Sequence, residues 1–237
     1  MNTTSHASVP AEAAAHRESL LRRVLTPAPV FELAGPDAPD RAQAEALVTE
    51  RFAAAWQARV THFLPWLLSM HCLGHCSGVA GLRPAARDAL FLEQYLAQPI
   101  ERELEARIGF PVARADIAEI GNLAVVQRGA SHLLFLVMTA ALHKAGYRWI
   151  AFTATRALRN NLDKLGYPLL QLANASPRNL DACTLAAWGR YYDSDPQVVV
   201  GSLDDAARLM HERPLLRRVL RLYRPQIRQL AHALGSA

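Results

Sequence analysis

Residues 119–167, EIGNLAVVQRGASHLLFLVMTAALHKAGYRWIAFTATRALRNNLDKLGY, carry most of the information about the fold. Their β-branched and other apolar residues predict a central strand over 115–126 and a second strand over 149–155. The apolar segment between these strands predicts a helix over 131–145. Gly146 marks its end, because glycine often follows the last residue of a helix. A further helix over 156–165 stops at Gly166. This alternation predicts a sheet covered by helices through right-handed crossovers.

The flanking segments extend the same pattern. Two strands joined by a tight turn are expected over 66–83, where Gly74 interrupts the apolar residues, and a short strand over 197–200. Helical spacing of apolar residues predicts helices over 42–56, 90–107 (split by Pro99), 177–188, 203–210 and 214–234. Prolines between 27 and 39 mark a linker. We therefore expect a flexible arm and linker over 1–40, one domain over 41–210, and a basic C-terminal helix over 211–237 packed on that domain.

The composition narrows the class of protein. A chain of 237 residues with 51% hydrophobic residues can bury a sizeable core. Its three cysteines cannot form a complete disulfide framework, and no segment near residue 1 has the order of a signal peptide, which favours a reducing cytoplasm. The longest apolar run, 133–142, is about half of the roughly 20 residues that cross a bilayer as a helix, so a core helix is expected.

The positive charge is concentrated in one segment. The formal net charge is +5, and residues 211–237 contain six arginines against the single acid Glu212. Such a stripe attracts an acidic partner or an anionic membrane surface, or it is simply the solvated face of a helix. Nucleic-acid binding is disfavoured, because no recognised binding motif accompanies the charge.

The loop before the long apolar helix is a candidate phosphate-binding site. Backbone N–H groups at a helix N-terminus lack intrahelical acceptors and lie at the positive end of the helix dipole. Gly129 would let a phosphate approach the backbone closely, and Arg128 would add a charge-assisted contact. The alternative is an ordinary turn before a helix.

The order of these segments resembles the central half of the GNAT acyltransferase fold, with its loop at 127–131 and its closing turn KLGY at 164–167. EIGNLA at 119–124 and GLRP at 81–84 are similar to strands of acyl-homoserine lactone synthases. The resemblance to the thermostable hemolysin family is closer and covers about 52–201. It rests on blocks in fixed order: GLRPA at 81–85, LFLEQYLAQPIE at 90–101, EIGNLA, FTATRALRN at 152–160 and WGRYY at 188–192.

The resemblance implies an α/β fold of GNAT-like topology, with a mixed central sheet and helices on both faces. It implies an acyltransferase that moves an acyl chain to an amine, with no tightly bound cofactor. The donor would be acyl-CoA or an acyl thioester on the phosphopantetheine of an acyl carrier protein. Carrier proteins are typically acidic, so we expect docking at Arg213, Arg217, Arg218 and Arg221. The alternative function is that of a membrane-active or lipid-binding protein, whose basic helix lies peripherally on a membrane.

Three residues are candidates for catalysis: Glu119, Asn122 and Arg83. An amine nucleophile must lose a proton, and Glu119 is an acid inside an apolar strand, where burial would raise its pKa. Its alternative role is a structural ion pair with Arg83. Asn122 either orients the substrate or caps the strand. Arg83 either binds a carboxylate or phosphate, or pairs with Glu93 or Glu119.

Two further groups of residues are candidates for binding. Backbone N–H groups near 123–125 are the oxyanion donors that the resemblance implies. The predicted donor site comprises Leu123, Ala124, Val125, Gln127, Arg128, Gly129, Ala130 and Ser131. The predicted acceptor side comprises Thr153, Thr155, Asn160 and Trp188. Hydroxyl groups at strand ends are often only caps, and Trp188 with Tyr191 and Tyr192 either walls an acyl tunnel or fills the core.

Two cysteine-containing features could indicate a zinc site and a cysteine nucleophile, but we predict neither. His71, Cys72, His75 and Cys76 have the residue types of a zinc site, but the nearby glycines favour a hairpin and no second spaced pair follows. Cys183 has no recognisable histidine partner motif. No metal is therefore expected.

Overall fold

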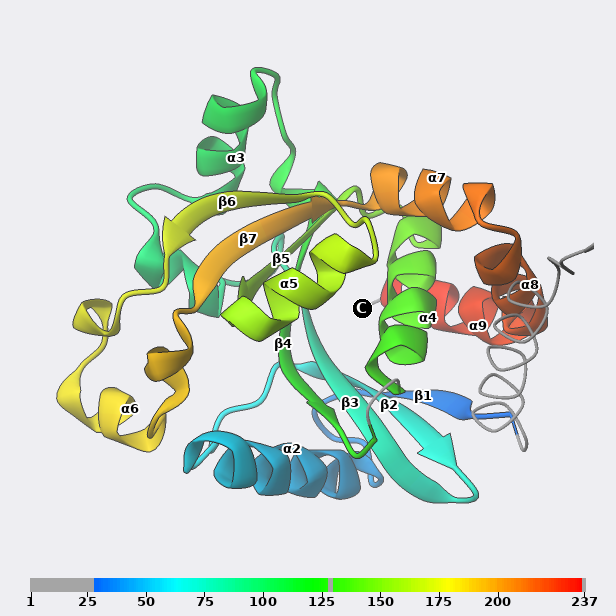
Figure 1. The fold of residues 1–237 in the computed structure, drawn as a ribbon, viewed down its shortest axis with the longest axis horizontal. Coiled ribbons are helices and arrows are strands. Elements are labelled where there is room, and N and C mark those ends of the chain that lie inside the picture. Colours follow the sequence, from blue (N-terminus) through cyan, green and yellow to red (C-terminus); the bar gives the residue numbers. More distant parts are fainter. Residues whose placement is uncertain (1–27, 128–129, 236–237) are drawn as a thin grey trace, which may run out of the picture.

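The computed structural model describes residues 28–127 and 130–235, which form a seven-stranded sheet wrapped by helices (Figure 1). The spatial order of the strands is β1-β2-β3-β4-β5-β7-β6. Only β4 and β5 run parallel, and every other neighbouring pair is antiparallel. The strands are β1 (Val30–Ala34), β2 (Trp66–Cys72), β3 (His75–Pro84), β4 (Ile117–Val125), β5 (Trp149–Ala154), β6 (Leu169–Asn174) and β7 (Gln197–Ser202).

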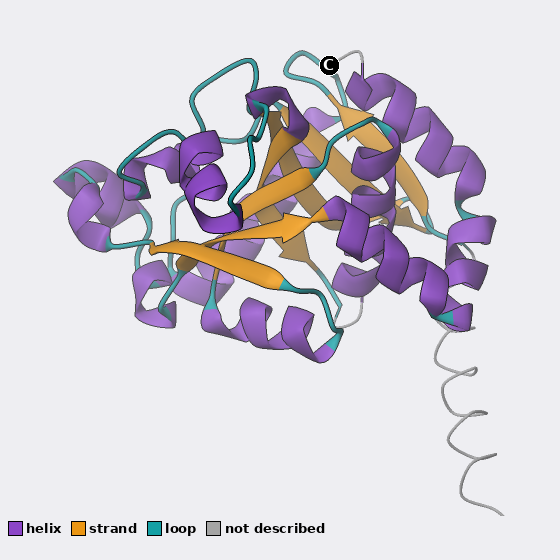
Figure 2. Ribbon diagram, turned by 90° about the horizontal axis from the view of Figure 1, so that it is seen from above, coloured by secondary structure: helices purple, strands orange, loops and turns teal. Residues whose placement is uncertain are grey.

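Helices lie on both sides of the sheet (Figure 2), as the sequence predicts. The longer ones are α2 (Arg41–Trp56), α3 (Ile100–Ile108), α4 (Ala130–Lys144), α5 (Arg156–Lys164), α7 (Leu203–Glu212), α8 (Pro214–Leu222) and α9 (Arg224–Gly235). The short ones are α6 (Ala182–Ala187) and the 3₁₀ turns η1 (Phe91–Tyr95), η2 (Arg114–Asp116), η3 (Pro177–Asn179) and η4 (Tyr191–Ser194).

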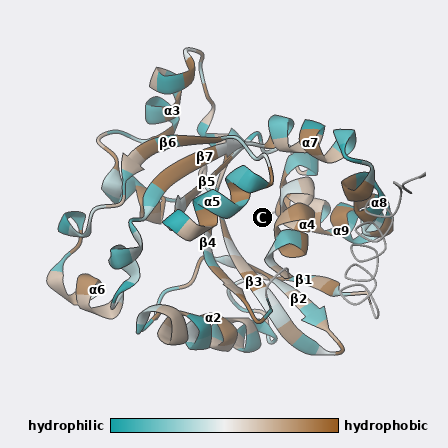
Figure 3. Cartoon of the chain, viewed as in Figure 1, coloured by the Kyte–Doolittle hydropathy of each residue, from teal (hydrophilic) through white to brown (hydrophobic). Residues whose placement is uncertain are grey.

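The alternation of side chains along each strand builds two layers of core. Leu68 and Met70 of β2 face α4 and α9, whereas Leu67, the residue before Leu68, faces the opposite side, under α2. Helix α4 is buried on most of its circumference, and Thr139 within it satisfies its hydroxyl by donating to the carbonyls of Phe135 and Leu136. Helix α5, by contrast, is largely hydrophilic (Figure 3). Among the described residues, no helix is long and apolar enough to cross a membrane.

Several elements differ from the prediction. The proposed linker contains β1, which pairs along β2 and buries Phe31 and Ala34, because prolines on either side do not prevent an edge strand. The edge strand β6 was not predicted. The helix expected over 177–188 is broken into η3 and α6, whereas the expected split of 90–107 at Pro99 is confirmed, with η1 before the proline and α3 after it. The part of the predicted arm before residue 28 lies outside the described residues.

The basic C-terminal helix is in fact two helices that belong to the core. They divide at Tyr223, just before Pro225, because proline cannot donate the helical hydrogen bond. Tyr223 is 1% exposed and meets Phe31 edge to face at a centroid distance of 5.4 Å. Ile227, Leu230 and Leu234 of α9 are buried in the same cluster.

Side chains from helices cover both edges of the sheet. The Gln226 side-chain oxygen of α9 accepts the N–H of Phe31 in β1 at 2.8 Å. At the other edge, Arg107 of α3 donates to the carbonyls of Gln171 and Leu172 in β6, at 3.1 and 3.0 Å. Unpaired strand edges are templates for association with other chains, so these contacts make both edges less available for such pairing.

We predict that Arg107→Ala increases self-association, because it frees two carbonyl groups on the outer edge of β6. Light scattering of concentrated protein measures the effect. The control is Arg102→Ala, an exposed arginine of the same helix that contacts only Glu105 within the described chain. Equal association of the two variants would show that the edge is protected by other means.

Tyr223 allows a test of core packing. Its hydroxyl is buried without a hydrogen-bond partner among the described residues, so Tyr223→Phe should leave the free energy of unfolding within about 1 kcal/mol of the native value or raise it. Tyr223→Ala should lose about 3–5 kcal/mol through the cavity it creates. Urea denaturation measures both. Tyr95→Phe is the matched control and should be destabilising, because it removes a hydroxyl that is hydrogen-bonded to Tyr192.

Candidate functional site

The sheet opens between β4 and β5. These strands pair from Ile117 with Trp149 to Ile120 with Phe152, and no later residue of β4 pairs with β5 within the described chain. Strand β4 nevertheless continues beside β3 as far as Val125, while β5 stays with β7 (Figure 1). One edge of β4 beyond Ile120 is therefore without a strand partner.

A β-bulge at Asn122 lies where the two strands separate. The register between β3 and β4 shifts by one residue between Val79 and Gly81, and Asn122 opposite this step has φ 48°. Asparagine tolerates this left-handed conformation better than most residues, and a bulge bends its strand. The Asn122 side-chain oxygen also accepts the N–H of Leu64 at 2.9 Å, which ties the segment before β2 to the bulge.

Glu119, three residues before the bulge, is buried with 3% of its surface exposed. Its carboxylate accepts the backbone N–H groups of Phe91 and Leu92 at 3.1 and 2.9 Å, and Arg83 Nη1 lies 3.7 Å from Oε2. Burial raises the pKa of the Glu119 carboxyl above its ordinary value, and these neighbours offset only part of the rise. The side chain is thus both a cap for η1 and a carboxyl with increased proton affinity.

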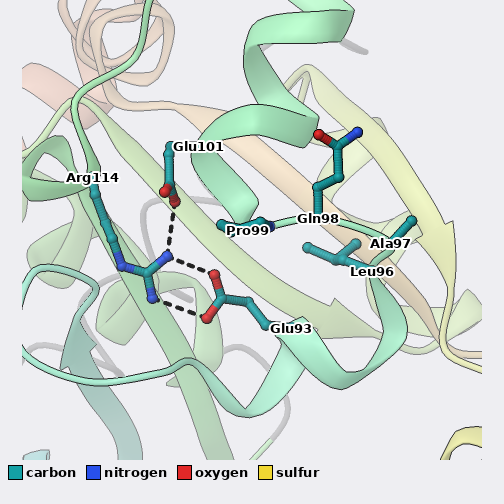
Figure 4. A pocket seen from close by; sticks show the side chains of 7 residues that line it. All are labelled: Glu93, Leu96, Ala97, Gln98, Pro99, Glu101 and Arg114. Atoms are coloured by element: carbon teal, nitrogen blue, oxygen red, sulfur yellow. Dashed lines mark hydrogen bonds and ion pairs between the residues drawn. The ribbon is translucent and has the colours of Figure 1, made fainter.

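A second carboxylate, Glu93, holds the same turn from the other side. It accepts the N–H of Leu90 at 2.8 Å and that of Ile100 at 3.0 Å, and it receives both terminal nitrogens of Arg114 at 2.6 and 2.9 Å (Figure 4). Burial alone would raise the pKa of Glu93, but Arg114 and the two N–H groups outweigh it and lower the pKa to about 2. The ion pair borders a pocket of about 420 Å³.

Sequence reasoning did not identify Arg114. The signal for Glu93 was present, since a glutamate three residues after the start of a turn often accepts the first N–H. Arg114 lies 21 residues further along the chain, and no local pattern connects the two.

Aromatic side chains gather on the η1 turn. Trp188 lies between Phe91 and Tyr191, with ring centroids 5.8 and 5.0 Å away. The hydroxyls of Tyr95 and Tyr192 are hydrogen-bonded to each other, and burial raises the pKa of both, so both remain protonated at neutral pH. Phe52 and Trp56 of α2 complete the cluster.

The residues predicted for the acceptor side are only partly brought together. The carbonyl of Thr153 accepts the hydroxyl of Tyr191 at 3.3 Å, which joins β5 to the aromatic cluster containing Trp188. Thr155 caps α5 by accepting the N–H of Leu158, and Asn160 is exposed on that helix. No described contact links these last two residues to Glu119.

The predicted donor-binding residues follow the bulge in order. Leu123, Ala124 and Val125 lie on the part of β4 that lacks a partner on the β5 side. Gln127 is exposed, and Ala130 and Ser131 begin α4. Arg128 and Gly129 lie outside the described residues. The free strand edge therefore leads directly toward the N-terminus of the central helix.

The other cysteine and histidine features do not form a site. His71 and Cys76 are cross-strand partners in the β2–β3 hairpin, as are Cys72 and His75. Cys183 is exposed near the start of α6. Among residues 28–127 and 130–235, no group of three or more His, Cys, Asp or Glu side chains is placed to hold a metal ion.

Comparison with solved structures identifies the fold. The CoA-dependent acyl-homoserine lactone synthase BjaI, solved with SAM and isopentyl-CoA, superposes with a TM-score of 0.53 at 13% identity, over 84% of this chain and 90% of BjaI. A second CoA-dependent synthase, MesI, gives a TM-score of 0.49 at 18% identity, over 82% of this chain and 95% of MesI. The predicted GNAT-like α/β fold is therefore confirmed.

Comparison of sequences identifies the family. The chain matches no curated protein. The family described as thermostable hemolysin matches residues 34–207, which include every strand except the first four residues of β1, and all the candidate residues for catalysis, donor binding and acceptor binding. Since this match covers most of the chain, the protein belongs to the thermostable hemolysin family.

Proposed function

We propose that the protein transfers an acyl chain from a thioester, on coenzyme A or an acyl carrier protein, to an amine. The observation that carries the proposal is the opening of the sheet at the Asn122 bulge, beside the buried carboxyl of Glu119. The likeness to BjaI, which was solved with isopentyl-CoA, supports a thioester donor.

The free edge of β4 suits an extended donor. The amide groups of a pantetheine arm can pair with a strand edge as an added strand does. Within Leu123, Ala124 and Val125, the N–H groups that point away from β3 would serve the arm and the tetrahedral oxyanion in this proposal. The first turn of α4, with Ala130 and Ser131 after Gln127, would receive phosphate oxygens, and Arg128 and Gly129 complete that loop in the sequence.

Glu119 is the base in this proposal, acting directly or through one water. It takes a proton from the amine as the new C–N bond forms; the C–S bond then breaks, and the leaving thiolate takes up that proton, directly or through water, to leave as the thiol and restore the carboxylate. Arg83 and the N–H groups of Phe91 and Leu92 fix the carboxylate. Asn122 contributes by holding the bulge against Leu64.

The acceptor and the acyl chain occupy the side of the opening that is formed by β5 and the aromatic cluster. Trp188 and Thr153 lie on this side, and Thr155 and Asn160 follow at the end of β5 and on α5. An aromatic wall favours an apolar acyl chain, because burial of its methylene groups stabilises binding by about 0.8 kcal/mol each.

The proposed dock for a carrier protein is the outer face of α8 with the residue before it. Arg213, Arg217, Arg218 and Arg221 are exposed, and none forms an ion pair with another described residue. An acidic carrier protein complements this charge. Leu215 and Leu222 are exposed on the same helix, which favours attachment to an anionic membrane as the alternative role of this face.

Glu119→Gln should lower kcat/KM for thiol release by about 10²–10⁴-fold, because the base is lost. In the native enzyme, activity should fall on the acid side with an apparent pKa above that of an ordinary glutamate, since the base must be ionised and burial raises its pKa. Thiol release from acyl-CoA and acyl carrier protein, across a panel of amines, measures both. Glu50→Gln, on the exposed face of α2, is the control. Full activity in a folded Glu119→Gln protein would remove Glu119 from the chemistry.

Charge reversal tests the dock. Arg217→Glu with Arg218→Glu should raise the KM for an acyl carrier protein at least about tenfold at low salt and much less at high salt, because screening weakens the attraction. The KM for acyl-CoA should not change. Arg59→Glu with Arg178→Glu makes the same change in net charge at other exposed positions. An unchanged KM for the carrier protein, together with lost binding to anionic vesicles, would assign this face to a membrane instead.

A further inference from the structure

Two carboxylates share the first N–H groups of one short turn. Glu93 accepts the N–H of Leu90, and Glu119 accepts those of Phe91 and Leu92. Groups at the start of a helical turn have no partner within the turn, so they need acceptors from outside it. The two negative groups are thereby held as close neighbours, one on the turn itself and one on β4 beneath it.

Arg114 fixes the first of these carboxylates within a closed loop. Its guanidinium binds both oxygens of Glu93 and one oxygen of Glu101, the latter at 2.8 Å (Figure 4). It also donates to the carbonyls of Ala85 and Asp88 at 2.7 and 3.1 Å. These contacts gather the segment from the end of β3 to the start of α3 around one planar cation. A lysine could not reproduce this fork of donors.

The chain returns from this network directly to the candidate base. Arg114 begins η2, and Ile117 begins β4 immediately after that turn. The N–H of Ala85 also donates to the carbonyl of Ile117 at 2.9 Å, which closes the loop at its base. The position of the η1 N–H groups relative to Glu119 is therefore set from both ends of the loop.

We propose that Arg114 and Glu93 are positioning residues that set the orientation and the proton affinity of Glu119 through the η1 turn. The proposal rests on the proposed function, in which Glu119 is the base. Glu93 and Arg114 need not touch substrate in this role. They act through the N–H groups that Glu119 accepts and through the charge balance next to it.

The charged and titratable groups around Glu119 define the sign of the effect. Arg83 on β3 favours its ionised form, whereas Glu93 on η1 disfavours it, and Tyr95 on η1 is neutral. Arg114 balances the charge of Glu93. Loss of Arg114 leaves Glu93 unbalanced and raises the proton affinity of Glu119. Loss of the Glu93 charge removes a negative neighbour of Glu119 while Arg114 stays paired with Glu101, and this lowers the proton affinity of Glu119.

Two variants should therefore move the acid limb of the pH–rate profile in opposite directions. Arg114→Met should shift it to higher pH and Glu93→Gln to lower pH, each by about half a unit to one unit. A merely structural role predicts damage to stability in both variants without opposed shifts. Arg102→Met removes an exposed arginine of the neighbouring helix α3 and should leave the limb in place.

A measurement without turnover separates this proposal from the proposed function. Carboxyl ¹³C titration of glutamate-labelled protein, with the Glu119 signal assigned by Glu119→Gln, reports the same pKa in the absence of substrate. Opposed shifts in this titration support the positioning role of Arg114 and Glu93 even if no thioester is consumed, in which case only the proposed function fails. Shifts in the same direction, or no shifts, overturn this positioning role. If Arg114→Met does not fold, Glu93→Gln decides alone, since the Glu119 pKa must fall.

Discussion

The buried carboxylate of Glu119 is the constraint on which the site depends. A charge at this depth must be hydrogen-bonded, since an unpartnered carboxylate in the interior is strongly destabilising. The N–H groups of Phe91 and Leu92 meet that need, and in doing so they fasten η1 to β4. The turn then carries Phe91 onto Trp188 and brings Tyr95 to Tyr192. The hydrogen bonds that satisfy the Glu119 carboxylate therefore also position the aromatic side chains carried by η1.

Strand β4 changes within a few residues from a strand paired on both edges to a strand with one free edge. Up to Ile120, β4 lies between two hydrogen-bonded neighbours and is held on both edges. After the bulge at Asn122 it keeps only β3, which leaves backbone groups available to a ligand. A site placed at such a transition combines fixed side chains with an unoccupied edge, a combination that a uniform sheet does not offer.

Local patterns predicted the parts of the fold that local physics determines. The β2–β3 hairpin, β4 and α4 are all rich in apolar residues and bounded by glycine or polar residues, and each was placed within a few residues. Strand β1 was hidden by its flanking prolines and the division at Tyr223 by the apolar pattern that continues across it, whereas β6 was missed although it is as long as β5 and β7. In the candidate site, the ion pair of Glu119 with Arg83 was among the expected alternatives. The N–H groups of η1 and the Arg114 network were not, because no local sequence pattern connects these groups with their partners.

The cover of β1 has a consequence for how the chain folds during synthesis. Phe31 receives its edge contact from Gln226, 195 residues later, and its ring packs against Tyr223 from the same region. A ribosome adds roughly 5–20 residues each second, so this edge waits on the order of ten seconds or more for its cover. During that interval the uncovered edge of β1 is exposed to other nascent chains on the same messenger RNA. Protection by chaperones at this stage would determine how much of the protein reaches the native state.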